Sequence, residues 1–565
     1  MLPSYVHGAA TTPLLGQTIG AALDDAGARC RDRDALISCH QNLRYTYEQL
    51  LDAVDRTARA LLALRIRRGD RIGIWSSNVA EWVITQYAAA KIGAILVNIN
   101  PAYRLRELEY VLKRSGISVL ITARGFRKTD YLPILAELAP ELDGACRGPL
   151  AIKTLPQLRH IVYLGEGVAP GGMTWDELTQ LAGQVPVDDL LRRQETLQFD
   201  DPANIQYTSG TTGLPKGATL SHHNILNNGF FVGEGLRYTP DDRICVTVPF
   251  YHCFGCVLAN LAALTHGAAI VLPAETFDPE ATLLAIEAQR CTSIYGVPTM
   301  FIGMLEHPLI DRVRLESLRT GIMAGSPCPV EVMRQVIERM HVREVTICYG
   351  MTETSPVSFQ SAVEDPIEIR VSTVGRIHPH LECKIVNPDS GEIVPRGAQG
   401  ELCTRGYSVM LGYWEDAEAT REVIDEARWM HTGDLGVMRE DGCVNITGRL
   451  KDVIIRGGEN VYPRQIEDFL YSHPKVSEVQ VVGVPDVRYG EAVCAWVRLR
   501  AGECATEEEI RSFCRGQIAT HNIPRYIRFT EEFPTTVTGK VQKYRMREIS
   551  ILELGLSSAE STPTA

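Results

Sequence analysis

Strands and helices alternate in the first third of the chain, and this alternation limits the folds that the sequence can adopt. The expected elements are a strand at 71–75, a helix at 78–92, a strand at 94–99, a helix at 106–115 and a strand at 117–122. Gly93 follows the first helix and can end it in a left-handed conformation. Strands that alternate with helices in this way predict a parallel sheet covered by helices on both faces.

The same alternation returns later, after a less regular stretch at 124–200 in which we place no strands. The later candidate strands lie at 244–248, 268–272, 292–295, 320–323 and 344–348. Near the N-terminus, Thr46 and Gln49 have the spacing of a capping box, so a helix is expected to begin there. Beyond residue 371 short strands separated by Gly and Pro turns indicate a small β-rich subdomain.

The segment 448–452 separates two self-contained patterns, and we place a domain boundary there. The elements expected after it are a strand at 453–455, a helix from Pro463, strands at 476–484 and 491–499, a helix capped by Thr506 and a strand at 526–530. The prediction is an α/β protein with a large domain of parallel βα layers plus the β-rich subdomain at 1–449, and a small α+β domain at 452–556. The composition of 557–565 predicts a disordered tail.

A loop rich in glycine and hydroxyl residues lies between an expected strand at 204–207 and a helix that begins near Ser221. Its sequence, residues 207–217, is Tyr-Thr-Ser-Gly-Thr-Thr-Gly-Leu-Pro-Lys-Gly. Glycine lets the backbone approach a ligand closely, successive N–H groups can surround an anion, and Lys216 adds a positive charge. The spacing does not match G-x-x-x-x-G-K-[S/T] of P-loop ATPases. The sequence therefore predicts a phosphate-binding loop of another kind.

Composition excludes several classes of protein. The chain has 565 residues, too many for one hydrophobic core. Its net charge of −12 argues against a nucleic-acid partner, because such binding needs a concentrated basic surface. Fifteen cysteines without regular spacing indicate reduced thiols in the cytoplasm. Cys253 and Cys256 form a single C-x-x-C, which without a second pair is weak evidence for a redox or zinc site.

We expect no membrane-spanning segment. Residues 244–274 contain no Asp, Glu, Lys or Arg, but Pro249, His252, Asn260 and His266 interrupt the apolar run. The first twelve residues lack the pattern of a signal or transit peptide. We therefore expect a cytoplasmic protein, either a monomer or a homodimer.

The phosphate loop and five later motifs resemble those of the adenylate-forming superfamily, which includes acyl-CoA synthetases, firefly-type luciferases and the adenylation domains of peptide synthetases. The later motifs are Tyr-Gly-Met-Thr-Glu at 349–353, Thr-Gly-Asp at 432–434, Gly-Arg at 448–449, the run from Lys451 to Glu467, and Pro534 to Lys540. They occur in the order that the superfamily has. Short sequences at 411–414 and 478–484 are most similar to medium-chain acyl-CoA synthetases of the family member 2 type.

The resemblance implies a set of nucleotide contacts. The residues that would hold the β- and γ-phosphates of ATP are Thr208, Ser209, Gly210, Thr211, Thr212, Gly213 and Lys216. Those that would line adenine are Gly325, Ser326, Pro327 and Tyr349. Thr352 would bind a phosphate, Glu353 would hold Mg²⁺, and Asp434 with Arg449 would bind the ribose. Ile347 stands where many relatives have a side-chain amide near the adenine amino group, so that contact would come from the backbone.

The resemblance also implies a mobile C-terminal domain with a hinge at 450–451. Lys540 would be the catalytic lysine of adenylation. Rotation about Lys451 would then withdraw it and present Gly457 and Gly458 to the pantetheine arm of coenzyme A. In the acyl site, His252 of the aromatic motif 249–255 would orient the carboxylate of the substrate, a small-molecule carboxylic acid.

The function that these motifs imply is ATP-dependent acyl-CoA synthesis, in which a fatty acid, ATP and coenzyme A give acyl-CoA, AMP and diphosphate. Medium-chain fatty acids are the expected substrates. Three alternatives remain open at this point: a stand-alone adenylation enzyme for an aryl or amino acid, a luciferase-like oxygenase, and a catalytically silent nucleotide-binding regulator. An amino acid would need a carboxylate to pair its ammonium, and 244–274 supplies none.

Overall fold

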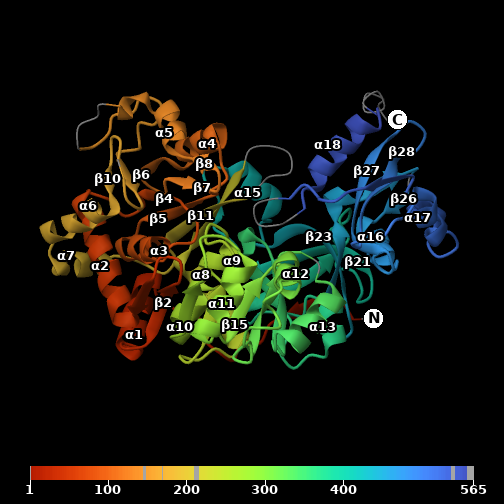
Figure 1. Ribbon diagram of the computed structural model, residues 1–565, viewed down its shortest axis with the longest axis horizontal. Coiled ribbons are helices and arrows are strands. Elements are labelled where there is room, and N and C mark those ends of the chain that lie inside the picture. The colour runs from red at the N-terminus through yellow and green to blue at the C-terminus, as the bar shows by residue number, and fades with distance from the viewer. Residues whose placement is uncertain are drawn as a thin grey trace. The chain divides into compact units, whose positions relative to one another are not determined.

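The structure is a computed structural model that describes residues 2–143, 148–167, 169–208, 215–326, 328–457, 459–535 and 541–556. The chain divides into two compact units (Figure 1). One unit comprises 7–382 and 404–430, and the other comprises 1–6, 383–403 and 431–565. The boundary and hinge expected near residue 450 stay predictions.

The first unit contains an eight-stranded sheet in the order β10-β9-β6-β4-β5-β11-β12-β22. Its strands are β4 (Arg71–Trp75), β5 (Ile95–Ile99), β6 (Ile117–Thr122), β9 (His160–Tyr163), β10 (Met173–Thr174), β11 (Pro202–Thr208), β12 (Lys216–Ser221) and β22 (Gly412–Tyr413). The strands from β10 to β11 pair in parallel, whereas β12 is antiparallel to both of its neighbours. The predicted parallel core of this sheet is confirmed.

A nine-stranded sheet in the same unit has the order β19-β18-β17-β16-β15-β13-β14-β2-β3. Its strands are β2 (Asp34–Ser38), β3 (Leu43–Thr46), β13 (Arg243–Val246), β14 (Ala269–Leu272), β15 (Ser293–Gly296), β16 (Thr320–Ala324), β17 (Glu344–Gly350), β18 (Val357–Gln360) and β19 (Arg376–Ile377). Strands β2 and β13–β17 are parallel, and antiparallel strands close both edges. All five candidate strands between 244 and 348 therefore exist.

Helices lie between the two sheets and on their outer faces (Figure 1). The helices of this unit are α1 (Ile19–Arg29), α2 (Tyr47–Ala63), α3 (Ala80–Ile92), α4 (Leu105–Ser115), α5 (Leu132–Leu138), α6 (Trp175–Gln180), α7 (Val187–Glu195), α8 (His222–Gly235), α9 (Cys253–Cys256), α10 (Asn260–His266), α11 (Pro279–Gln289), α12 (Pro298–Leu305), α13 (Val330–Arg339), α14 (Ile367–Ser372) and α15 (Ala417–Val423). Helix α3 contacts β2, β4 and β5 and is buried on nearly every side, as its apolar sequence requires.

Local signals determine where several of these helices begin and end. Thr46 and Gln49 form the predicted capping box of α2, in which each side chain bonds the backbone of the other residue. Gly93 ends α3 and Gly267 ends α10, both in the left-handed conformation. The region 124–200, where no strands were placed, contains β7 (Gly125–Phe126) and β8 (Thr129–Asp130) together with β9 and β10.

The second unit contains most of a five-stranded sheet, β1-β20-β21-β23-β24, and a separate sheet in which β27 and β28 pair over their whole length. The strands are β1 (Tyr5–His7), β20 (Leu381–Val386), β21 (Gln399–Gly406), β23 (Met430–Met438), β24 (Val444–Arg449), β25 (Ile454–Arg456), β26 (Glu459–Val461), β27 (Val476–Asp486), β28 (Gly490–Leu499) and β29 (Tyr526–Phe529). The helices are α16 (Pro463–Tyr471), α17 (Glu507–Cys514) and α18 (Lys543–Glu553). The α+β pattern predicted for this part of the chain is confirmed.

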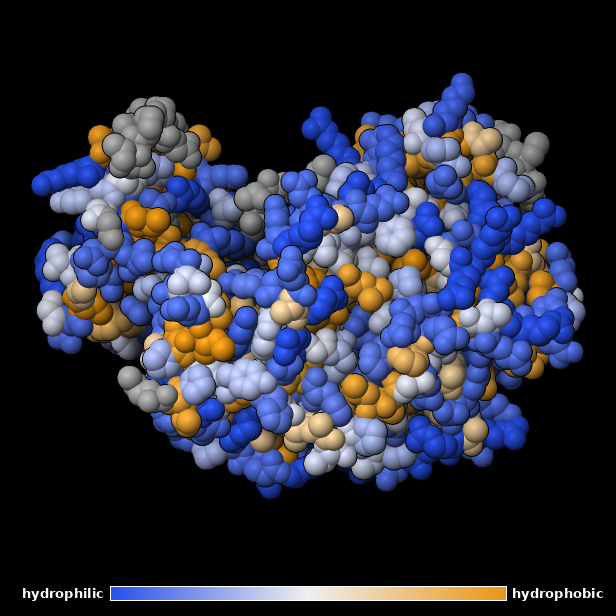
Figure 2. Space-filling model, turned by 180° about the vertical axis from the view of Figure 1, so that it is seen from behind, coloured by the Kyte–Doolittle hydropathy of each residue, from blue (hydrophilic) through white to orange (hydrophobic). Residues whose placement is uncertain are grey.

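On the face of the molecule in Figure 2, hydrophilic side chains predominate and hydrophobic ones form scattered patches. Scattered apolar side chains are usual on a protein surface. Within the ranges that the structure describes, no helix has the length and apolarity needed to cross a membrane.

Candidate functional site

The carboxylate of Glu353 is the centre of a small polar cluster. Glu353 lies in a single 3₁₀ turn (Thr352–Thr354) directly after β17 and is only 5% exposed. The phenol of Tyr413 donates a hydrogen bond to Glu353 Oε1 at 2.9 Å. The hydroxyl of Thr208, at the end of β11, approaches the same oxygen at 3.4 Å. Two motifs that the sequence predicted to act together, the phosphate loop and the Thr-Glu pair, are therefore adjacent.

Tyr413 is a residue of this cluster that the sequence analysis did not single out. Burial, together with the neighbouring Glu353 carboxylate, raises the pKa of its phenol well above the usual range. The phenol therefore stays protonated and remains a hydrogen-bond donor at physiological pH. The available signal was the aromatic residue in Leu-Gly-Tyr-Trp at 411–414, but its partner lies 60 positions away along the chain.

Lys216 lies over the ring of Tyr413. Its ammonium is 5.2 Å from the ring centroid and 3.8 Å from a carboxylate oxygen of Glu422. Because both carboxylate and ammonium are partly exposed, this ion pair is weak. Lys216 and Glu353 thus share Tyr413 as a neighbour, the ammonium through the ring and the carboxylate through the phenol.

The two ends of the phosphate loop are paired with each other. Thr208 is opposite Lys216 in the antiparallel ladder of β11 and β12, so the loop leaves and re-enters the sheet at one place. Five of the predicted phosphate residues lie outside the described part of the chain: Ser209, Gly210, Thr211, Thr212 and Gly213. The described residues therefore place the stem of the loop next to Glu353.

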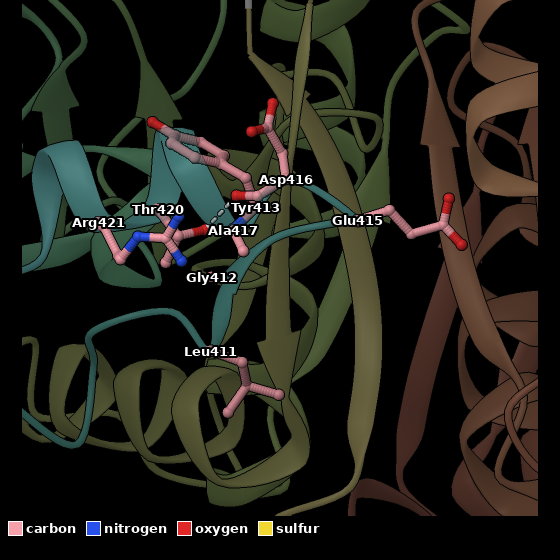
Figure 3. Close-up of a pocket in the computed structure, with 8 residues that line it drawn as sticks. All are labelled: Leu411, Gly412, Tyr413, Glu415, Asp416, Ala417, Thr420 and Arg421. Atoms are coloured by element: carbon pink, nitrogen blue, oxygen red, sulfur yellow. Dashed lines mark hydrogen bonds between the residues drawn. The ribbon is translucent and has the colours of Figure 1, made fainter.

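A pocket of about 590 Å³ opens beside Tyr413 (Figure 3). The residues that line it are Leu411, Gly412, Tyr413, Glu415, Asp416, Ala417, Thr420 and Arg421. The hydroxyl of Thr420 accepts a hydrogen bond from the Tyr413 backbone N–H at 2.9 Å, which fixes the backbone from which the phenol extends. None of the residues predicted for the site lines this pocket, and Tyr413 is the member of the cluster that borders it.

His252, the histidine predicted for the acyl site, lies close to Thr352 because both contact the thiol of Cys253. His252 caps α9, where its Nδ1 accepts a hydrogen bond from the backbone N–H of Phe254 at 3.2 Å. A neutral ring that accepts at Nδ1 carries its proton on Nε2. The thiol of Cys253 lies 3.5 Å from His252 Nδ1 and 3.8 Å from the Thr352 hydroxyl. His252 and Thr352 thus both contact one buried sulfur atom.

Neither cysteine of the C-x-x-C motif has the environment of a reactive thiol. Cys253 and Cys256 are each 1% exposed. Burial raises the pKa of Cys253 to about 12 and also raises that of Cys256. Reactive and metal-binding cysteines need the thiolate form, which burial disfavours. The two residues pack as small apolar side chains beneath the cluster.

The predicted adenine residues follow two neighbouring strands. Ala324 at the end of β16 is paired with Cys348 of β17, so Gly325 and Ser326 begin next to the strand end that carries Tyr349. Gly325 has a φ of +91°, a conformation that favours glycine. Ser326 is exposed, and Pro327 lies outside the described residues.

Ile347 supplies no polar group to the adenine region. Its side chain is 7% exposed and belongs to a buried hydrophobic cluster. Its backbone N–H donates to the Ser361 hydroxyl at 2.9 Å. Recognition of the adenine amino group by the backbone of another residue stays a prediction.

Asp434 and Arg449, the predicted ribose residues, form an ion pair in the second unit. They are opposite each other in the antiparallel ladder of β23 and β24, and Arg449 Nε lies 2.7 Å from Asp434 Oδ1. Asp434 is 4% exposed, so the charge-assisted contact fixes the direction of its carboxylate. The structure confirms that these two residues are together.

The residues predicted for the hinge and for coenzyme A are only partly described. Partial burial and the like charge of Arg449 lower the pKa of Lys451. Gly457 has a φ of +62°, and its N–H donates to the carbonyl of Tyr489 at 2.7 Å. Gly458 and Lys540 lie outside the described residues, so their roles stay predictions.

Comparison with known proteins gives consistent matches over nearly the whole chain. Residues 23–414 match the model of the AMP-binding enzyme family, and 465–540 match that of the AMP-binding enzyme C-terminal domain. The chain is 48% identical over 547 residues to YngI of Bacillus subtilis (strain 168), which covers 97% of this chain and 100% of that protein. It is 46% identical over 555 residues to the mitochondrial medium-chain acyl-CoA ligase ACSF2 of Danio rerio, covering 98% of this chain and 91% of the relative.

One similar solved structure contains a bound acyl-adenylate. The anthranilate CoA ligase AuaEII, in complex with anthranoyl-AMP, is similar with a TM-score of 0.83 and 26% identity. The similarity covers 96% of this chain and 99% of that chain.

Proposed function

The chain belongs to the AMP-binding enzyme family, and from this premise we propose that it joins medium-chain fatty acids to coenzyme A. It is an AMP-forming acid–CoA ligase that uses ATP and proceeds through an acyl-adenylate. The observation that carries the site assignment is the cluster of Thr208, Lys216, Glu353 and Tyr413, which places a buried carboxylate and a cation at the stem of a glycine-rich loop.

In the first step a carboxylate oxygen of the fatty acid attacks the α-phosphorus of ATP, and the bond to diphosphate breaks. This transfer leaves little covalent chemistry to the protein, so positioning and neutralisation of charge supply the acceleration. Lys216 and the Thr208 hydroxyl support the β- and γ-phosphates. Thr352 donates to the α-phosphate, and Lys540 neutralises the charge that develops between the carboxylate and the α-phosphorus.

The residues of the cluster fit a magnesium ion. Mg²⁺ prefers oxygen ligands and is held in many proteins by one or two carboxylates together with substrate phosphates. Glu353 offers a buried carboxylate, and the Tyr413 phenol occupies one side of Oε1 and thereby orients the group. Glu353 would hold the ion, which would neutralise negative charge on the phosphates.

In the second step the thiol of coenzyme A attacks the acyl carbon, and AMP leaves. His252, with its proton on Nε2 and its Nδ1 held by the backbone of α9, orients the acyl carbonyl for both steps. Withdrawal of Lys540 by rotation about Lys451, which brings Gly457 and Gly458 to the pantetheine arm, separates the two half-reactions. This alternation rests on the motif match at 451–467 and 534–540.

The test is release of AMP and diphosphate with carboxylic acids from acetate through long-chain fatty acids to benzoate and amino acids, with and without coenzyme A. CoA-dependent AMP formation that peaks with medium-chain fatty acids is the expected result. Turnover with amino acids alone would support an adenylation enzyme of another kind, and no turnover with any acid would support a silent regulator. Glu353→Gln, which keeps the size of the side chain, is the inactive control.

We further propose a cytoplasmic protein that works as a monomer or a homodimer. Each of the fourteen cysteines in the described ranges is a free thiol, which is typical of a reducing compartment. Light scattering during size-exclusion chromatography measures the number of subunits.

A further inference from the structure

A carboxylate that no motif assignment includes holds the segment of β23 just before Asp434. Glu401 lies on β21, next to β23 in the sheet, and is 7% exposed. Its Oε2 accepts a hydrogen bond from His431 Nδ1 at 2.8 Å, and its Oε1 accepts one from the backbone N–H of Gly433 at 3.1 Å. Both oxygens of one buried side chain therefore hold the same short segment, residues 431–433.

A second pair of contacts fixes the same segment of β23. The hydroxyl of Thr432 donates to the carbonyl of Leu402 at 2.7 Å, and it accepts from the backbone N–H of Asp434 at 3.1 Å. Gly433 has a φ of +69°, which L side chains rarely adopt. Glycine is therefore favoured at this position of β23, and contacts from β21 hold the backbone of residues 432 and 433.

Glu401, Cys403 and His431 also have the residue types of a metal site, and their ligand atoms lie within 4.8 Å of one another. The distances argue against an ion. Two atoms that bind one tetrahedral zinc at about 2.0–2.1 Å lie about 3.3 Å apart. Glu401 Oε2 and His431 Nδ1 are 2.8 Å apart, which is the distance of a direct hydrogen bond. The sulfur of Cys403 is 3.5 Å from His431 Nδ1, farther away than the carboxylate oxygen.

We propose that Glu401 is a positioning residue for nucleotide binding: by holding His431 and the N–H of Gly433, it fixes the segment of β23 that places Asp434 for the ribose. Asp434 itself is directed by Arg449 at 2.7 Å from one side. Glu401 fixes the backbone from which that carboxylate extends. This inference rests on the proposed assignment of Asp434 to the ribose.

The experiment measures binding of AMP and of 2′,3′-dideoxy-AMP to the full chain by calorimetry, without any acid or coenzyme A. In the wild type the two ribose hydroxyls contribute to affinity, so the dideoxy nucleotide binds more weakly. In Glu401→Ala we expect AMP affinity to fall about tenfold, as for loss of a charge-assisted hydrogen bond. The affinity for dideoxy-AMP should change by less than about threefold, because the ribose contact is already missing.

Two further variants separate positioning from a general structural role. Cys403→Ala is the matched control, since it alters a buried side chain on the same strand and leaves both bonds of Glu401 in place. It should bind both nucleotides like the wild type. Glu401→Gln keeps one acceptor oxygen and should recover part of the lost affinity. If Glu401→Ala does not fold, Glu401→Gln alone carries the comparison between the two nucleotides.

Three results would overturn the inference. Equal losses for AMP and dideoxy-AMP in the Glu401 variants would mean a general effect on the fold. Stoichiometric zinc in the purified wild type that disappears in Cys403→Ala would mean a metal site. Unchanged AMP binding in Glu401→Ala would contradict the positioning role and would not affect the proposed enzymatic function. A wild type that binds no AMP would contradict both proposals.

Discussion

The phenol of Tyr413 donates a 2.9 Å hydrogen bond to Oε1 of Glu353. One residue comes from β22, an edge strand of the eight-stranded sheet, and the other from the turn after β17 of the nine-stranded sheet, so the contact joins two different sheets. Because Glu353 is buried, the direction of its carboxylate depends on this donor and on Thr208. The direction of the Glu353 carboxylate is therefore set by residues that only the folded sheets bring together.

Tyr413→Phe should lower the rate of adenylation when magnesium is limiting. The variant keeps the Glu353 carboxylate but removes one hydrogen bond to it, a loss of about 1.5–3 kcal/mol, or about 10- to 100-fold in kcat/KM at limiting Mg²⁺. The measurement is diphosphate release as a function of magnesium concentration. Tyr163→Phe, which removes a phenol bonded to the Pro170 carbonyl far along the sheet, is the control. An unchanged magnesium dependence in Tyr413→Phe would contradict the role of the phenol.

Lys540→Ala should slow adenylation and spare the thioester step. If the lysine acts as one transition-state donor, its loss costs about 10² to 10³ in the rate of acyl-adenylate formation. The two steps are measured separately, with ATP and acid for the first and with supplied acyl-AMP and coenzyme A for the second. Lys543→Ala is the matched control, because Lys543 forms a 2.6 Å ion pair with Glu467 and should affect stability alone. A comparable loss in both steps would argue against a separate adenylating role.

Lys451→Pro should have the opposite effect on the two steps. Proline fixes φ and restrains rotation at this position, so formation of acyl-CoA from supplied acyl-AMP should fall while adenylation is retained. Lys451→Ala removes the same ammonium without restraining the backbone and should retain both steps. The idea of alternation fails if the proline variant loses adenylation and thioester formation equally, or if the alanine variant behaves like it.

Stability should fall between pH 6.5 and 5 because of three buried histidines. Burial lowers the pKa of His160 and His222 to about 4 and that of His378 to about 3. Below pH 6.5 the unfolded chain binds protons at these sites and the folded chain does not, so acid favours unfolding. The slope is at most about 1.4 kcal/mol per pH unit for each histidine.

The measurement is the free energy of unfolding in urea as a function of pH. His222→Gln should lower the dependence by about one proton. A flat profile in the wild type would mean that these rings take up protons without unfolding.

The regular elements could be predicted because their signals are local. Strands β4 and β6 and the capping box of α2 lie where the sequence placed them, since periodicity, caps and terminal glycines act within a few residues. The region 124–200 could not be read, because its strands β7 and β10 have only two residues each. So short a strand has no measurable alternation.

The site could be predicted only where motifs carried it. Glu353, Asp434 and Arg449 were predicted as site residues from their sequence neighbours, and the structure adds the partners that orient them, while their roles stay predictions. Tyr413 and Glu401 could not be assigned, because each acts through a contact with a strand or turn that is distant in sequence. The pairing of strands that are far apart along the chain gives no signal within a short stretch of sequence.

The pairing of β12 with β22 has a consequence for how such a chain can diverge. Tyr413 is opposite Ala218, so the stem of the phosphate loop and the donor to Glu353 are joined directly by a two-stranded ladder. The whole segment from 222 to 411, which includes the motif at 249–255 that is predicted for the acyl site, begins and ends at that ladder. The free-energy cost of closing such a segment rises slowly with its length. An insertion in the loop at 249–255 can therefore be accommodated without loss of the β12–β22 pairing, whereas Glu353, which lies in the same segment, must keep its contact with Tyr413.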